Sequence, residues 1–257
     1  MPVGPETSFG WQEAAIAFTM IAVVAFLVTW VVTDLGHVSR TPYVAILTLV
    51  SLGLGAGYLA WSGTSLADLV TPGWGLGILA GVIAAVVVVP GVRRLPRGPR
   101  AEGAQLAGRL LWEGGVYGIA EAILLATLPV LAVWQTAVAL GWTDTIWAEI
   151  GSGALAVAGA LLVIALHHLG YREFRGRAAK PKLTGALVAC GVQALAFLVT
   201  GNVIAPVVAH ILLHAQLITR GTALPPASSG EPSSRAAHPG VVTEPPAPRR
   251  DRVASRG

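Results

Sequence analysis

Long apolar runs separated by short polar segments are the dominant pattern along this chain. A helix needs roughly 20 apolar residues to cross a hydrocarbon core about 30 Å thick. Seven runs approach that length, at residues 11–32, 42–61, 74–92, 116–140, 150–169, 183–200 and 203–219. The pattern therefore predicts an all-α, polytopic membrane bundle of about seven transmembrane helices, contained in a domain of residues 1–220.

The composition supports the same class. Of the 257 residues, 54% are hydrophobic and 12% are charged, so a water-soluble domain of this size would lack the polar surface it needs. No Lys or Arg precedes the first run, and its flank carries Glu6 and Glu13 instead. We therefore expect this run to be retained as a span rather than cleaved as a signal peptide. The single cysteine, Cys190, lies in the sixth run and is expected to pack there.

The 17 Lys and Arg residues fall only in alternate loops. Arg40 follows the first run, and the others are Arg93, Arg94, Arg97, Arg100 and Arg109 after the third run, Arg172, Arg175, Arg177, Lys180 and Lys182 after the fifth, and Arg220 with the C-terminal segment. Because basic loops stay in the cytoplasm, this alternation predicts an odd number of spans, with the N-terminus outside and the C-terminus cytoplasmic. The net charge of +4 thus indicates topology, and the expected partner is the lipid bilayer rather than nucleic acid.

Residues 221–257 form a segment rich in Pro, Ser, Ala and Arg. Its apolar content is too low to offset the entropy lost on ordering, so we predict a disordered cytoplasmic tail. Binding to a Pro-recognising partner or to anionic headgroups is the alternative.

Ionisable residues inside the apolar runs are the candidates for chemistry. They are Glu121 in the fourth run, the adjacent His167 and His168 at the end of the fifth, and His210 and His214 in the seventh. Such a side chain at the centre of a span costs roughly 2.5 to 3.5 kcal/mol, so its presence indicates a function. The alternative for each histidine is a hydrogen bond to a neighbouring helix, or extension toward the interface.

The predicted topology places these residues at similar depths. His168 lies four residues before Arg172 and His214 six before Arg220, which puts both roughly 6 to 9 Å inside the cytoplasmic boundary. The helix that carries Glu121 enters the membrane from the same side, so Glu121 lies no deeper than roughly 18 Å. We therefore expect one site in the inner half of the membrane.

Helical geometry narrows the set further. His210 and His214 are four residues apart, so their imidazoles stack on one face of a helix. His167 and His168 are separated by about 100° of rotation, so only one of them should point to a common centre.

The stretch TGNVIAPVVAHILLH at 200–214 resembles the last motif of the CPBP intramembrane proteases. This family includes the type II CAAX prenyl endopeptidases and bacteriocin-processing proteins. The family motif ends in HxxxN or a close variant, and here it reads His210-x-x-x-His214. The resemblance covers roughly residues 110–215.

Two other stretches resemble the earlier motifs of the family. IALHHLGY at 164–171 fits the family's FxxxH motif with Ile164 and His168, which favours His168 over His167. EAILLA at 121–126 fits EExxxR with the second Glu replaced by Ala122 and the Arg replaced by Ala126.

The resemblance implies an endopeptidase that cleaves a membrane-associated or prenylated peptide near the cytoplasmic face. Glu121 and His168 would activate a water, while His210 and His214 would orient it or stabilise the developing charge. The same four residues would be plausible ligands if a divalent metal such as zinc took part. Because Ala126 replaces the motif Arg, a catalytically inactive immunity or scaffold protein is the alternative, followed by a metal or proton-relay transporter.

Overall fold

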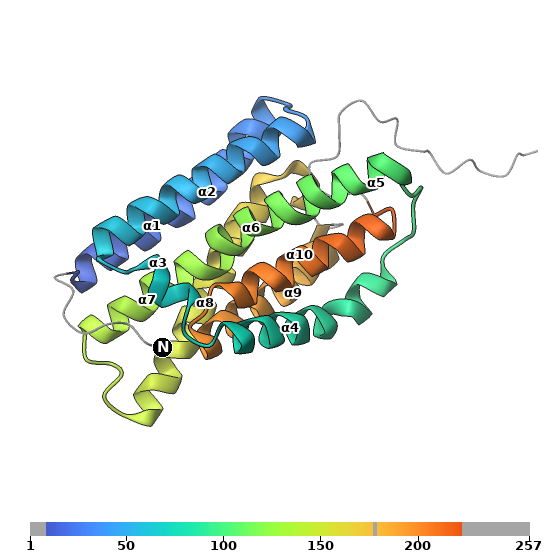
Figure 1. Cartoon of the computed structure of the whole chain (residues 1–257). Helices are drawn as coiled ribbons and strands as arrows, with labels where there is room; N and C mark the ends of the chain where they lie inside the picture. Colours follow the sequence, from blue (N-terminus) through green and yellow to red (C-terminus); the bar gives the residue numbers. More distant parts are fainter. Residues whose placement is uncertain (1–8, 177–178, 223–257) are drawn as a thin grey trace, which may run out of the picture.

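The structure, a computed structural model, describes residues 9–176 and 179–222, and this part is built of helices with no β-strand (Figure 1). The predicted all-α polytopic bundle is confirmed. The predicted disordered tail lies outside the described residues from position 223 onward. The α-helices are α1 (Trp11–Thr29), α2 (Arg40–Ser62), α3 (Leu66–Val70), α4 (Trp74–Arg94), α5 (Gly103–Arg109), α6 (Tyr117–Glu121), α7 (Leu128–Ala139), α8 (Ile146–Gly170), α9 (Lys180–Thr200) and α10 (Ile204–Thr219).

Several α-helices continue into π-helical turns without a break. These π-helical segments are η1 (Trp30–Leu35), η2 (Leu110–Val116) and η3 (Ala122–Thr127), and a short 3₁₀ turn, η4 (Arg172–Phe174), follows α8. As a result, residues Gly103–Ala139 form one helix of 37 residues that begins well before the predicted start at residue 116. Arg109 and Glu113, four residues apart, pair across one turn of this extension at 3.0 and 3.2 Å and add to its stability.

Within the described residues, six helices are long and apolar enough to cross a membrane, and they range from 21 to 37 residues. The predicted seventh run also forms a helix, α10, but this helix has 16 residues. It is therefore about 24 Å long, shorter than a hydrocarbon core of about 30 Å.

Helices α1 and α8 run in the same direction. Gly159 of α8 lies against Phe18 of α1, and Gly170 lies against Thr29, so both helices advance together along the bundle. Basic residues gather at the end of the bundle where α1, α4 and α8 end and where α2 and α9 begin. We call this the basic end, and it is marked by Arg40, Arg94 and Lys180 at the helix termini.

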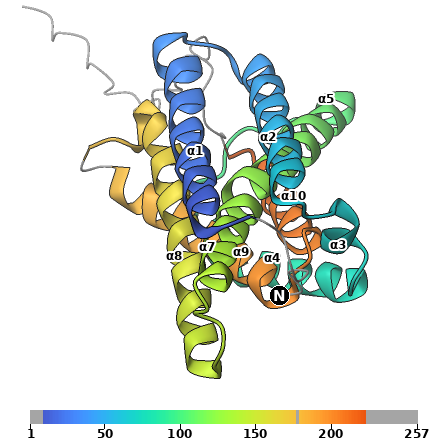
Figure 2. The same ribbon diagram turned by 90° about the vertical axis from the view of Figure 1, so that its left-hand side faces the viewer.

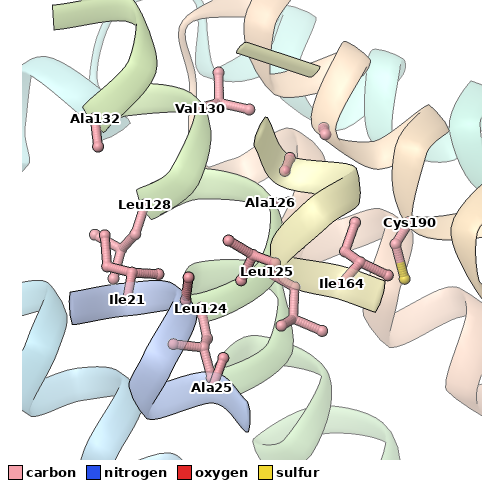
Figure 3. Packing of buried hydrophobic residues seen from close by; sticks show 14 of the residues in the cluster. Ile21, Ala25, Leu124, Leu125, Ala126, Leu128, Val130, Ala132, Ile164 and Cys190 are labelled. Atoms are coloured by element: carbon pink, nitrogen blue, oxygen red, sulfur yellow. The ribbon is translucent and has the colours of Figure 1, made fainter. Parts of the chain in front are cut away.

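The helix Gly103–Ala139 lies at the centre of the bundle, and Figure 1 shows it between the α1–α2 pair and the α4–α10 pair. It is the most buried of the long helices, with 78% of its apolar window buried. Figure 3 shows Leu124 beside Ala25 of α1, with Ile164 of α8 and Cys190 of α9 on the other side of the central helix. Polar groups in such a setting must find partners within the protein.

The outer surface of the bundle is apolar. Trp147, Val199 and Leu49 expose 79%, 74% and 72% of their surface, and they lie on three different helices. Side chains of this kind, repeated around the bundle, fit contact with lipid tails rather than water. The protein is therefore an integral membrane protein with the bilayer as its environment.

Helices α4 and α10 run in the same direction and in close contact, side by side in Figure 1, while Figure 2 shows α1 between α8 and α2. Gly77 of α4 faces Asn202 just before α10, and Gly81 faces Ala205 and Val208. A Cβ at Gly81 would lie 2.6 Å from the Ala205 carbonyl oxygen and 2.8 Å from Val208 Cβ. The absence of a side chain at Gly81 therefore sets the spacing of the two helices.

Gly81→Val is expected to destabilise the protein by about 1–3 kcal/mol, because the new side chain must push α10 away from α4. The measurement is the thermal midpoint of the purified protein in detergent. Gly75→Val is the matched control on the same helix, since no neighbouring atom lies within 4 Å of a Cβ at Gly75. Equal midpoints for the two variants would contradict this account.

Candidate functional site

Glu121 ends α6 and is enclosed by π-helical segments on both sides, η2 before α6 and η3 directly after it. A π-helical turn admits an extra residue and redirects the side chains that follow it, and such turns occur often at functional sites. Only 5% of Glu121 is exposed, although its surroundings are mainly apolar. A carboxyl group in that setting is stable only where donors face it.

Two histidines from different helices supply those donors. Nε2 of His214 on α10 lies 2.7 Å from Oε2 of Glu121, and Nε2 of His167 on α8 lies 3.4 Å from Oε1. A carboxylate only accepts hydrogen bonds, so an Nε2–H of His214 donates to it. The other nitrogen of His214, Nδ1, is buried and has no hydrogen-bond partner in the described part of the chain.

The structure brings His167 to Glu121, whereas the sequence motif favoured His168. Nδ1 of His168 lies 2.9 Å from the Ile164 carbonyl, and its ring packs against Phe174 at 4.9 Å between centroids. Adjacent residues of a helix point in different directions, and the packing of α8 against its neighbours turns His167, not His168, toward Glu121. Among the described contacts, His168 thus meets the site through ring edges alone, at 5.3 Å from His167 and 6.2 Å from Tyr171 between centroids.

His210 and His214 share one face of α10 as their spacing predicted, with stacked rings 6.1 Å apart. Nδ1 of His210 lies 3.3 Å from the Pro206 carbonyl, and Nε2 lies 3.9 Å from Sγ of Cys190. Nδ1–H therefore donates to the carbonyl, and the neutral ring presents a lone pair at Nε2. His210 borders the Glu121–His214 pair without hydrogen-bonding to Glu121 in the described contacts.

A cluster of hydroxyl groups adjoins His167, and the sequence reasoning missed it. The Thr29 hydroxyl lies 2.9 Å from Nδ1 of His167, and the Tyr171 hydroxyl lies 3.3 Å from Nε2. Tyr171 in turn lies 2.7 Å from the Tyr43 hydroxyl and 2.9 Å from that of Tyr117. The sequence did contain an indication of this cluster. Its four residues, Thr29, Tyr43, Tyr117 and Tyr171, all occur near the predicted cytoplasmic ends of apolar runs.

Glu121, His167 and the hydroxyl cluster therefore form one buried hydrogen-bonded network joining α1, α2, α6, α8 and α10. Its groups come from helices that the apolar pattern predicted, apart from Tyr171 directly after α8, and they come from five separate regions of the chain. We call this set of residues, together with His214, the polar network. The packing of the helices, and not a local sequence motif, brings these groups together.

Within the described residues, no three His, Cys, Asp or Glu side chains are grouped as a metal site requires. Glu121, His168, His210 and His214 therefore do not form a ready ligand set. A cavity of about 290 Å³ lies elsewhere, between α1 and α2, and is lined mainly by apolar residues such as Met20 and Leu54.

In comparisons with known proteins, no family model matches this chain, and no curated protein or solved structure matches it significantly. The resemblance to CPBP proteases rests on the motifs alone.

Proposed function

We propose that this chain is an intramembrane endopeptidase that hydrolyses a membrane-associated or lipid-modified peptide. The observation that carries the proposal is the buried pair of Glu121 and His214, joined at 2.7 Å, with Nδ1 of His214 left without a hydrogen-bond partner among the described residues. A carboxylate that holds one imidazole nitrogen while the other stays available is the arrangement of a general base and its orienting partner.

In the proposed reaction, Nδ1 of His214 takes a proton from a water whose oxygen attacks the peptide carbonyl carbon. Glu121 stabilises the imidazolium through Nε2–H, as the carboxylate does in other His–carboxylate pairs. The tetrahedral intermediate then collapses, the C–N bond breaks, and the departing amine receives the proton from Nδ1. Water is thereby added across the peptide bond.

The surrounding groups have supporting roles. His167 holds the second oxygen of Glu121 and so fixes the carboxylate for His214. The Tyr117 ring packs against His214 at 5.0 Å, and its hydroxyl provides, with Tyr171, O–H donors suited to a developing oxyanion. His210 supports His214 by ring stacking, since its neutral Nε2 accepts rather than donates.

We further infer that the chain crosses the membrane seven times and that the basic end faces the cytoplasm. The positive charge at that end and the parallel directions of α1 with α8 and of α4 with α10 support this topology. The polar network lies toward the basic end, because α2 begins three residues before Tyr43 and α8 ends just before Tyr171. Cleavage would then occur on the cytoplasmic side.

The proposal is tested by reconstituting the purified protein in liposomes with a library of membrane-anchored peptides, with and without prenyl groups, in H₂¹⁸O. Hydrolysis is expected to place one ¹⁸O atom in the new carboxyl group of a product, detected by mass spectrometry. If no peptide is cleaved by protein that is folded and oriented, the peptidase proposal fails, which leaves a catalytically inactive scaffold or immunity protein, or a proton relay.

His167→Ala is expected to reduce turnover by about 10²-fold, because Glu121 loses one of its two anchors and can swing away from His214. His168→Ala is the matched control on the adjacent residue and should leave turnover close to the wild-type value. The measurement is the initial rate of cleavage in the same liposomes. A lower cleavage rate in His168→Ala than in His167→Ala would show that the motif-based choice of His168 was right.

A second candidate function, a proton relay, is favoured by the buried row of ionisable and hydroxyl groups that runs from Glu121 past His167 and Tyr171 to Tyr43, with 2.7 to 3.4 Å between neighbouring atoms. Proteoliposomes with an imposed pH gradient and an internal pH dye distinguish it from a peptidase. A relay would dissipate the gradient in the wild type and not in Glu121→Gln.

A further inference from the structure

Arg40 is a buried cation without hydrogen-bond partners. It begins α2 at the basic end, and only 9% of its surface is exposed. None of its three guanidinium nitrogens, Nε, Nη1 and Nη2, has a partner within the described residues. Burying a charged donor group without acceptors is strongly unfavourable, so such a group calls for an explanation.

The nearby acidic residue does not compensate Arg40. Oε2 of Glu113 lies 3.9 Å from Nε of Arg40, beyond hydrogen-bonding distance. Both carboxylate oxygens of Glu113 are bound by Arg109, at 3.0 and 3.2 Å. One carboxylate is therefore shared between two guanidinium groups, and a positive charge is left over.

The other contact of Arg40 is with an aromatic face. Its guanidinium carbon lies 4.2 Å from the centroid of the Tyr117 ring. A cation over an aromatic ring is stabilised by the ring quadrupole, but the ring face offers no acceptor for the N–H groups at the guanidinium edge. Those N–H groups are buried and still lack an acceptor within the described residues.

The N-terminus of α2 adds a second positive feature at the same place. The first intrahelical bond is donated by Tyr43 to the Ser39 carbonyl, and Pro42 has no N–H, so the first-turn donors that precede this bond are the N–H groups of Arg40 and Thr41. The Ser39 side chain makes no cap hydrogen bond, and the first turn contains no acidic residue. A helix of 23 residues thus presents the positive end of its dipole beside an unpaired Arg, where a negative group would be favoured.

We propose that Arg40 and the first turn of α2 bind a phosphate-class oxyanion. The planar guanidinium fork matches two oxygens of a phosphate group, and the helix N-terminus favours its charge. The oxyanion is carried by a phospholipid headgroup or is free phosphate, since the site lies at the basic end of a membrane bundle. This inference does not depend on the proposed peptidase activity.

The test uses the full chain in maltoside micelles, which contain no phosphate. Inorganic phosphate and short-chain phosphatidic acid are titrated separately at constant ionic strength, and the thermal midpoint is measured. Wild type is expected to be stabilised by one or both, whereas Arg40→Met should respond to neither. Arg94→Gln removes an exposed charge at the same end and should respond as wild type does.

The two titrations distinguish the sources. Stabilisation by phosphatidic acid alone assigns a lipid headgroup, and stabilisation by both assigns a site open to the free ion. Arg40→Lys, which keeps the charge but not the fork, should need a higher phosphate concentration for the same shift. If wild type does not respond, or if Arg40→Lys and Arg40→Met respond as wild type does, the oxyanion site is refuted.

Discussion

Replacing Glu121 with Gln is expected to lower the rate of peptide cleavage by about 10²- to 10⁴-fold. The Gln side chain has almost the same shape, and its amide oxygen can still accept a hydrogen bond from Nε2 of His214. It carries no charge, however, so it cannot stabilise the imidazolium that forms when Nδ1 takes a proton from water. The loss should therefore appear in the chemical step, with little change in substrate binding.

The measurement is the single-turnover rate of the reconstituted protein. Glu149→Gln makes the same chemical change at an exposed position of α8 and is expected to retain the wild-type rate. The thermal midpoint and the circular dichroism spectrum of Glu121→Gln show whether the bundle is intact. A folded Glu121→Gln variant that cleaves at the wild-type rate would remove Glu121 from the mechanism.

His214→Ala is expected to reduce cleavage at least as far as Glu121→Gln, because it removes the proposed base itself. If the two residues act as one unit, the double variant Glu121→Gln/His214→Ala should be no slower than His214→Ala alone. Independent roles would instead give losses that multiply. The comparison thus tests the pair, and not only the importance of each residue.

The control for this cycle is His37→Asn, which removes an exposed histidine near the same end of the bundle and tolerates the left-handed backbone there, where φ is 48°. All variants are compared at equal amounts of folded protein, since removing one member of a buried pair can cost about 3–5 kcal/mol of stability. Multiplicative losses in folded variants would show that Glu121 serves the reaction by a route other than His214.

Much of the fold was predictable because its causes are local. The length and apolarity of a run determine whether it forms a membrane helix, and the placement of Lys and Arg indicates which loops share a side. The stacking of His210 and His214 also follows from the spacing within one helix. The early start at Gly103 was harder to predict, because the Arg109–Glu113 pair lowers the cost of polar residues only once the helix has formed.

The candidate site was predictable as a set of residues but not as a geometry. An apolar run that contains Glu121 or a histidine stands out in any membrane protein sequence, because polar groups there are costly. Tyr43, Tyr117 and Tyr171 did not stand out, since tyrosine is common near the ends of membrane helices. Arg40 was counted as a loop charge, although the structure buries it against Tyr117.

Composition and charge pattern alone therefore establish an α-helical membrane protein with one basic end, and they identify Glu121, His210 and His214 as residues to explain. The tertiary structure alone decides that His167, and not His168, faces Glu121, and that five helices contribute to one polar network. The physical reason is that the rotation of each helix about its axis depends on its neighbours. Close packing at positions such as Gly118, where a Cβ would lie 3.1 Å from the Ile211 nitrogen, sets that rotation.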